Sequence, residues 1–227
     1  MNSNTKTARN ASCFQTSGTL LLSLKGWASV PENFPYGLGA LILNYTLYQS
    51  ELVPRWISVW GLVGAILLLA MGFLRLYGRP VEYLAIPIIL NELVLAGWLI
   101  AYGFESFAST SVIVGVLIIA ALISTILNGV FIKSMNRSEY LSAVAADEKN
   151  VLTGVIFQLA LTASVVAIPI ILFPILREHG QSIALGYVVA RIFEGFFDVI
   201  IAISQLLLLT LSREFIKTDI NRKNEQI

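Results

Sequence analysis

Residues 191–198 read Arg-Ile-Phe-Glu-Gly-Phe-Phe-Asp, and they place three ionisable side chains inside a segment that is otherwise apolar enough to span a membrane. One charge at the centre of a membrane helix costs roughly 2.5–3.5 kcal/mol on insertion scales. Steps of three and four residues put Arg191, Glu194 and Asp198 on one helical face, and Gln205 continues that face. We therefore expect a membrane helix here whose polar face needs partners on other helices.

The composition of the whole chain is that of a membrane protein. Hydrophobic residues make up 56% of the 227 residues and charged residues 13%, whereas soluble domains have roughly 45–50% and 25%. Several apolar runs are long enough to cross a bilayer, so the lipid bilayer is the expected surrounding. The net charge of +1 is too small for a nucleic-acid-binding surface, so we expect no nucleic acid partner.

The sequence offers little material for catalysis. Cys13 is the single cysteine and His179 the single histidine, so we predict no intramolecular disulfide and no metal site. No zinc-protease motif, glycine-rich phosphate loop or nucleophile elbow is present in the sequence. We therefore predict a protein that is not an enzyme and has no catalytic residues and no cofactor.

The hydrophobic pattern predicts an all-α, polytopic membrane bundle. One membrane domain, residues 16–211, lies between a flexible polar amino terminus, 1–15, and a polar tail, 212–227. Its six expected membrane helices are 34–50, 56–74, 83–104, 106–132, 151–176 and 183–211. The first is only just long enough to cross about 30 Å of hydrocarbon. Because most connections are short, we expect sequential helices to be antiparallel neighbours.

Residues 16–30 precede the first expected membrane helix and are separated from it by Pro31 and Pro35. We predict a short amphipathic helix at the membrane interface, with Lys25 and Trp27 at the level of the headgroups. An additional half-span is the alternative.

The distribution of lysine and arginine predicts the orientation in the membrane. If the amino terminus is cytoplasmic, the outer loops hold only Arg55 and Arg177. The inner segments then hold Lys6, Arg9, Lys25, Arg75, Arg79, Lys133, Arg137, Lys149, Arg213, Lys217, Arg222 and Lys223. This bias favours two cytoplasmic termini.

Several stretches of the chain resemble one known family of bacterial membrane proteins. They are Leu52-Val-Pro-Arg-Trp-Ile-Ser-Val-Trp-Gly61, Asn91-Glu-Leu-Val-Leu-Ala-Gly-Trp98, Ala184-Leu-Gly-Tyr-Val-Val-Ala-Arg-Ile-Phe-Glu194, Ala146-Asp-Glu-Lys-Asn-Val-Leu152 and Leu211-Ser-Arg-Glu-Phe215. The family is the one catalogued as domain of unknown function 4386. The resemblance implies a six-span helical protein in the bacterial inner (plasma) membrane, and it supplies no catalytic residue and no ligand.

The order of these stretches differs from that of typical family members. The part that resembles residues 112–217 usually comes first, and the part that resembles residues 14–104 follows it. Such an exchange is a circular permutation, with Phe215 and Phe14 at the former connection and a new join near residues 105–111. Permutation is tolerated where the two ends of a domain lie close together. The family's Pro-Arg-Trp loop is usually rich in arginine and cytoplasmic, which conflicts with the orientation favoured by the lysine and arginine count.

The candidate functional residues form an intramembrane polar cluster of Arg191, Glu194, Asp198, Glu92 and Asn91. Glu92 lies near the middle of its expected span, so Arg191 is expected to pair with Glu194 or with Glu92 across the bundle. One base cannot neutralise three acids, so at least one carboxyl group is protonated or meets water or a cation.

Two kinds of role remain open for this cluster. The first, which we favour, is architectural, because polar residues also hold membrane helices together. The second is a small-solute or proton-coupled transporter that uses the acids at the membrane midplane. A sensory or assembly subunit is a further alternative. A homo-oligomer, another protein partner and a small ligand all stay open.

Other residues inside the expected spans are expected to have structural roles. Asn44, Asn128 and Gln158 are expected to make hydrogen bonds between helices. Gly61 and Ala65 are expected to let a neighbouring helix approach closely. Pro87, Pro169 and Pro174 are expected to kink the helices that contain them.

Overall fold

The computed structural model describes residues 3–79, 81–104, 107–136 and 139–224, and the regular structure in these ranges is entirely helical. The predicted all-α fold is confirmed. The described helices are α1 (Ser3–Ser29), α2 (Asn33–Ser50), α3 (Arg55–Leu76), α4 (Ile86–Ala101), α5 (Ala108–Phe131), α6 (Tyr140–Ala146), α7 (Glu148–Leu176) and α8 (Gln181–Asn224). Short 3-10 turns occupy Glu82–Ala85, Lys133–Asn136 and Arg177–His179. The expected helix start at 106 and the chain ends 1–2 and 225–227 lie outside the described residues.

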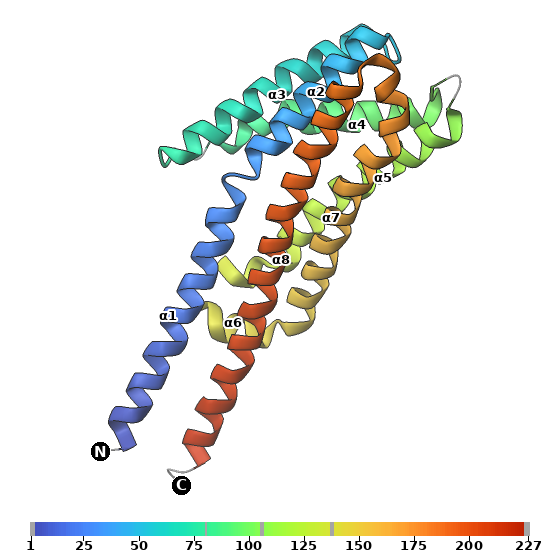
Figure 1. Ribbon diagram of the computed structural model, residues 1–227. Coiled ribbons are helices and arrows are strands. Elements are labelled where there is room, and N and C mark those ends of the chain that lie inside the picture. The colour runs from blue at the N-terminus through green and yellow to red at the C-terminus, as the bar shows by residue number, and fades with distance from the viewer. Residues whose placement is uncertain (1–2, 80, 105–106, 137–138, 225–227) are drawn as a thin grey trace.

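Six of these helices pack into a closed ring. Contacts run from α2 to α3, α4, α5, α7 and α8 in turn, and α8 contacts α2 to close the ring. Because short links join α2 to α3 and α7 to α8, those neighbours run in opposite directions. α1 lies outside the ring along α8, and both ends of the chain are at the same end of the molecule (Figure 1). The ring leaves a central space toward which five helices contribute side chains.

Five described helical segments are long and apolar enough to cross a membrane. They are Arg55–Leu76, Glu82–Ala101, Ala108–Phe131, Glu148–His179 and Gln181–Thr218. α2, the first of the six expected spans, is a helix but is not among them. Its 18 residues include Asn44, Thr46 and Gln49, which lower its hydropathy. Length and composition thus identify five of the six expected membrane helices, and α2, which is shorter and more polar, packs between α3 and α8 in the same ring.

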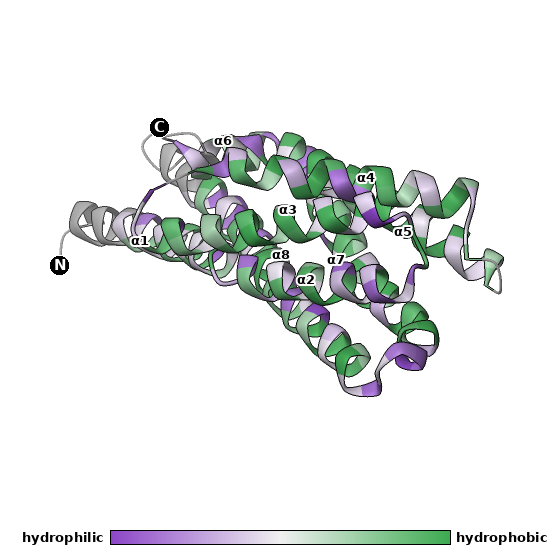
Figure 2. Cartoon of the chain, turned by 90° about the horizontal axis from the view of Figure 1, so that it is seen from above, coloured by the Kyte–Doolittle hydropathy of each residue, from purple (hydrophilic) through white to green (hydrophobic). Residues whose placement is uncertain are grey.

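The outer surface of the ring is apolar. Large hydrophobic side chains are exposed on α3, α4, α5, α7 and α8, including Ile66, Leu93, Ile126, Ile156 and Phe193. Hydrophobic residues, green in Figure 2, cover most of the length of these helices. Water-soluble monomers rarely expose continuous apolar surface on this scale. The chain is therefore a multi-pass membrane protein whose outer surface meets lipid.

The two ends of the chain are more helical than expected. α1 begins at Ser3 and not at residue 16, and α8 continues to Asn224, well beyond residue 211. Phe14 and Phe215 pack edge to face with ring centroids 6.0 Å apart, and Leu21 and Leu22 of α1 join the apolar cluster around Leu208. This packing supplies the tertiary contacts that a polar terminal segment needs to remain helical.

Pro87 does not lie inside a helix. The expected span 83–104 is divided into the 3-10 turn Glu82–Ala85 and α4, and Pro87 is in the first turn of α4. A proline is tolerated there because the first helical N–H groups have no carbonyl partner inside the helix. The expected kink at Pro87 is therefore wrong, whereas Pro169 and Pro174 do lie inside α7.

Candidate functional site

Arg191 of α8 lies at the centre of the predicted polar cluster. Its Nη1 donates to both carboxylate oxygens of Glu194, at 3.0 and 2.7 Å. Its Nη2 lies 3.9 Å from Oε1 of Glu92, on α4. One guanidinium thus faces a carboxylate on its own helix, three residues away, and a second carboxylate across the ring. Both Arg191 and Glu194 are buried, with 6% and 5% of their surface exposed.

Two tyrosines complete the surroundings of Arg191. Its Cζ lies 5.4 Å from the ring centroid of Tyr36, on α2, and 5.9 Å from that of Tyr187, one turn earlier on α8. Aromatic faces attract cations at this distance, and the attraction is stronger away from water. α2 can approach because Gly39 has no side chain, since a Cβ there would lie 3.1 Å from Cδ of Arg191. Arg191 therefore links α2, α4 and α8.

Asp198 lies farther along the same face of α8. Nε2 of Gln158, on α7, donates to its Oδ1 at 2.7 Å, and only 1% of Asp198 is exposed. Among the described residues, no arginine or lysine nitrogen lies within 4 Å of Asp198. This carboxyl group therefore has one amide donor and no ion-pair partner in that part of the chain.

Gln205 continues the face, as the spacing predicts, and it is fully buried. Nδ2 of Asn128, on α5, donates to the Gly154 carbonyl of α7 at 2.7 Å and to Oε1 of Gln205 at 3.3 Å. The prediction that Asn128 and Gln158 bond between helices is confirmed. This end of the polar face joins α5, α7 and α8 and is a structural network.

Asn91 and Asn44 bring amide groups to the opposite side of the ring. Nδ2 of Asn91 donates to the Ile57 carbonyl of α3 at 2.7 Å. Nδ2 of Asn44 donates to Ala40, one turn earlier on its own helix, so the expected interhelical bond of Asn44 is wrong. Its amide instead packs against Gly61, which confirms that Gly61 allows close approach of a neighbouring helix. Oδ1 of each asparagine is buried without a hydrogen-bond partner among the described residues.

These side chains surround an enclosed cavity inside the ring. Its polar lining consists of Asn44, Asn91, Glu92, Tyr187 and Arg191, and leucine, isoleucine and alanine side chains from α2, α4, α5 and α7 complete it. About 10 Å³ is open to the centres of water molecules, roughly the space of one water. The Tyr187 hydroxyl and Arg191 Nε are also buried and lack a well-aligned partner in the described structure. The cavity wall therefore carries several buried polar side chains next to the Glu92 carboxylate.

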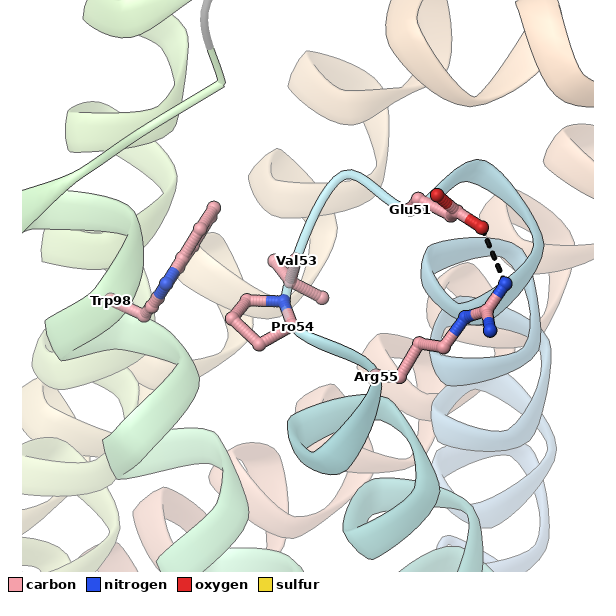
Figure 3. A pocket seen from close by; sticks show the side chains of 5 residues that line it. All are labelled: Glu51, Val53, Pro54, Arg55 and Trp98. Carbon is pink, nitrogen blue, oxygen red and sulfur yellow. Dashed lines mark hydrogen bonds and ion pairs between the residues drawn. The ribbon is translucent and has the colours of Figure 1, made fainter.

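A second hollow lies at the surface, where the α2–α3 loop meets α4. Glu51, Val53, Pro54, Arg55 and Trp98 line it, and Arg55 forms an ion pair with Glu51 (Figure 3). Both charged side chains are about two-thirds exposed, at 64% and 66%. An exposed pair is worth at most about 1 kcal/mol. This hollow is open, and its two charged side chains already pair with each other. The enclosed cavity is therefore the stronger candidate site.

The structure brings most of the predicted residues together. Arg191, Glu194 and Glu92 form one cluster, Asn91 lies beside Glu92 on the cavity wall, and Asp198 follows about one turn beyond Glu194. Sequence reasoning missed Tyr36 and Tyr187, although Tyr187 lies four residues before Arg191 and hence on the same helical face.

Comparison with known proteins places the chain in a family. Residues 3–103 and 113–227 match the family described as Domain of unknown function (DUF4386). The chain belongs to this family, as its sequence stretches suggested. No curated protein and no solved structure matches it.

Proposed function

We propose that this chain is a transporter that couples the movement of protons to that of a small polar solute, and that it is not an enzyme. One observation carries the proposal: inside the ring Glu92 and Glu194 share a single arginine, and the buried Asp198 one turn farther on has no ion-pair partner among the described residues. An uncompensated buried charge costs several kcal/mol. Binding of a proton or a cation removes that cost, and acids in this position are used by proton-coupled transporters.

The enclosed cavity supports the solute part of the proposal. Tyr187 and Arg191 on its wall carry hydrogen-bond donors and Glu92 carries acceptors, so the cavity can bind a small molecule that both donates and accepts hydrogen bonds. Glu92 lies on the same wall, so the charge of Glu92 can depend on what the cavity holds. This arrangement offers a direct physical link between proton binding and solute binding.

A second candidate function is architectural, and a separate observation favours it. Asn128, Gln205 and the Gly154 carbonyl join three helices through hydrogen bonds. Asn91 likewise joins α4 to α3. Such bonds contribute roughly 0.6 kcal/mol each in membrane proteins. We assign this role to the Gln205 end of the polar face and the transport role to the Arg191 end.

The test is proton flux in proteoliposomes that carry an imposed pH gradient and an internal pH-sensitive dye. Wild type is expected to dissipate the gradient faster than empty vesicles, and Glu92→Gln and Asp198→Asn are expected to abolish the difference. Glu51→Gln is the matched control, because Glu51 is 66% exposed and pairs with the similarly exposed Arg55. Flux that survives both buried substitutions, or a wild type equal to empty vesicles, overturns the transport proposal.

We also propose that the protein resides in a bacterial plasma membrane with both termini in the cytoplasm. The lysine and arginine bias supports this orientation, and both termini lie at one end of the molecule (Figure 1). Fusions of a reporter active only outside the cytoplasm test it. Activity is expected after Pro54 and after Gly180, and absence of activity after Asn224. The reverse pattern contradicts the orientation.

The exchanged order of the chain is proposed to be a circular permutation. Two observations support it: the family match is interrupted between residues 103 and 113, and Phe14 packs directly on Phe215. Ends that touch can be joined by a short connection without disturbing the helices between them.

A further inference from the structure

Glu32 lies at the joint between α1 and α2. Its N–H donates to the Ala28 carbonyl at 3.4 Å, and its own carbonyl accepts from the Tyr36 N–H at 3.2 Å. Glu32 is therefore one helical turn before Tyr36 and shares its face. Because the ring of Tyr36 covers Arg191, this face is the one that α2 turns toward α8.

The direction of α8 determines what Glu32 meets. α8 runs antiparallel to α1 and α2, since Gly39 lies against Arg191 whereas Phe14 lies against Phe215. Residues that precede Tyr36 in the sequence therefore lie beside residues that follow Arg191 on α8. Glu32, one turn before Tyr36, thus lies opposite Glu194 and Asp198. The geometry places a fourth carboxylate beside the three predicted ones.

The charges around Glu32 agree with this position. Burial raises the pKa of Glu32 well above its ordinary value, and the negative charges of Asp198 and Glu194 raise it further. Arg75 of α3 is the cation that opposes this shift of the Glu32 pKa. Arg75 is itself held by the carbonyl and hydroxyl oxygens of Ser29, at 3.4 and 3.3 Å, and by Glu82 at 3.6 Å.

Glu32 differs from its neighbours in exposure. It is half-buried, whereas Asp198 and Glu194 are buried. A carboxyl group that is partly exposed and lies near a buried acid can take a proton from outside and pass it inward. Glu32 is thus positioned between the buried Asp198 and the outer surface of the ring of helices.

We propose that Glu32 is the residue through which Asp198 exchanges protons with water. The protonated carboxyl group of Glu32 gives its proton to the Asp198 carboxylate and becomes a carboxylate, which then takes the next proton from solvent. The reverse sequence releases a proton. The joint between α1 and α2 holds Glu32 in place, and Arg75 stabilises its charged state. This proposal rests on the proposed proton transport.

The experiment compares Glu32→Gln, Glu32→Asp and the exposed control Glu51→Gln in the proteoliposome flux assay. Glu32→Gln is expected to slow proton flux about tenfold or more, since a positioned proton donor commonly contributes 10²–10⁴-fold. Glu32→Asp is expected to restore part of the flux and to shift its pH profile. Wild-type flux in Glu32→Gln, measured beside an inactive Asp198→Asn, overturns the role of Glu32 and leaves the transport proposal intact.

A second measurement does not depend on flux. Infrared difference spectra over a pH series report the protonated carboxyl band of Glu32, which is identified by its loss in Glu32→Gln. Because the charge of Asp198 raises the pKa of Glu32, that pKa is expected to fall in Asp198→Asn. An unchanged Glu32 midpoint in Asp198→Asn overturns the proposed contact even if the wild type proves to transport nothing.

Discussion

The side-chain amide of Asn44 occupies the place where a side chain at Gly61 would lie. A Cβ added to Gly61 of α3 would be 2.0 Å from Oδ1 of Asn44 on α2, and the other two amide atoms are nearly as close. The absence of a side chain at one position thus creates room for a buried polar group at the other. Asn44 also lines the cavity, and its Oδ1 is buried against Gly61 without a hydrogen-bond partner among the described residues.

Gly61→Ala is expected to destabilise the protein by about 1–3 kcal/mol, because the buried Asn44 has no free space into which to move. Thermal unfolding in detergent measures the loss. Gly97→Ala is the matched control, since a Cβ at Gly97 of α4 has nothing within 4 Å. Equal unfolding temperatures for the two variants contradict the close packing of α2 on α3.

Arg191→Met is expected to cost about 3–5 kcal/mol, because it leaves the carboxylates of Glu92 and Glu194 without their shared cation. Arg191→Met combined with Glu194→Gln is expected to recover part of this loss in the same unfolding measurement. Arg55→Met is the control, because its exposed ion pair with Glu51 contributes at most about 1 kcal/mol. A double variant that is as unstable as Arg191→Met alone argues against charge as the cause.

The stability of the protein is expected to depend on the charge of Glu32. The pKa of Glu32 is raised in the folded protein. Its contribution to stability is therefore complete below the unfolded pKa and is lost as the pH rises through the folded pKa. Glu32→Gln should unfold at the same temperature as wild type near pH 4 and at a higher temperature near pH 8. A difference in unfolding temperature between the two proteins that is the same at both pH values contradicts this expectation. Glu51→Gln serves as an exposed control.

The chain should tolerate the circular permutation that we propose relates it to other family members. A variant that starts at Phe107, ends at Phe104 and joins Phe215 to Phe14 through a short flexible linker is expected to fold. Its unfolding midpoint should lie within about 4 °C of wild type, which corresponds to about 1 kcal/mol for a chain of this size. Size-exclusion chromatography and thermal unfolding check it. Aggregation of this variant, with wild type monodisperse, contradicts the permutation.

Local patterns predicted the parts of the fold that depend on neighbouring residues in the sequence. The α2, α3, α5 and α7 boundaries lie within a few residues of the predicted ones, because prolines, glycines and charged residues flank the apolar runs. Arg191, Glu194, Asp198 and Gln205 share a buried face of α8, as their spacing indicates.

Features that depend on residues distant in sequence could not be predicted in this way. Polar residues 3–15 are helical because α1 packs along α8, and nothing within those residues shows that contact. Glu32 lies beside the cluster because α2 runs antiparallel to α8. Asn44 donates to a carbonyl of its own helix because Gly61, which has no side-chain acceptor, faces it. Helix order alone does not determine which side chains meet across the ring.

The length of α8 has a mechanical consequence. Its 44 residues form one unbroken helix, which at 1.5 Å per residue is about 66 Å long. The hydrocarbon layer is only about 30 Å thick. An unbroken helix transmits tilt and rotation along its axis, so a displacement of α8 at Arg191 moves Phe215 and the α1 segment packed on it. We therefore expect α8 to act as a lever that links the surroundings of Arg191 to the packed ends of the chain.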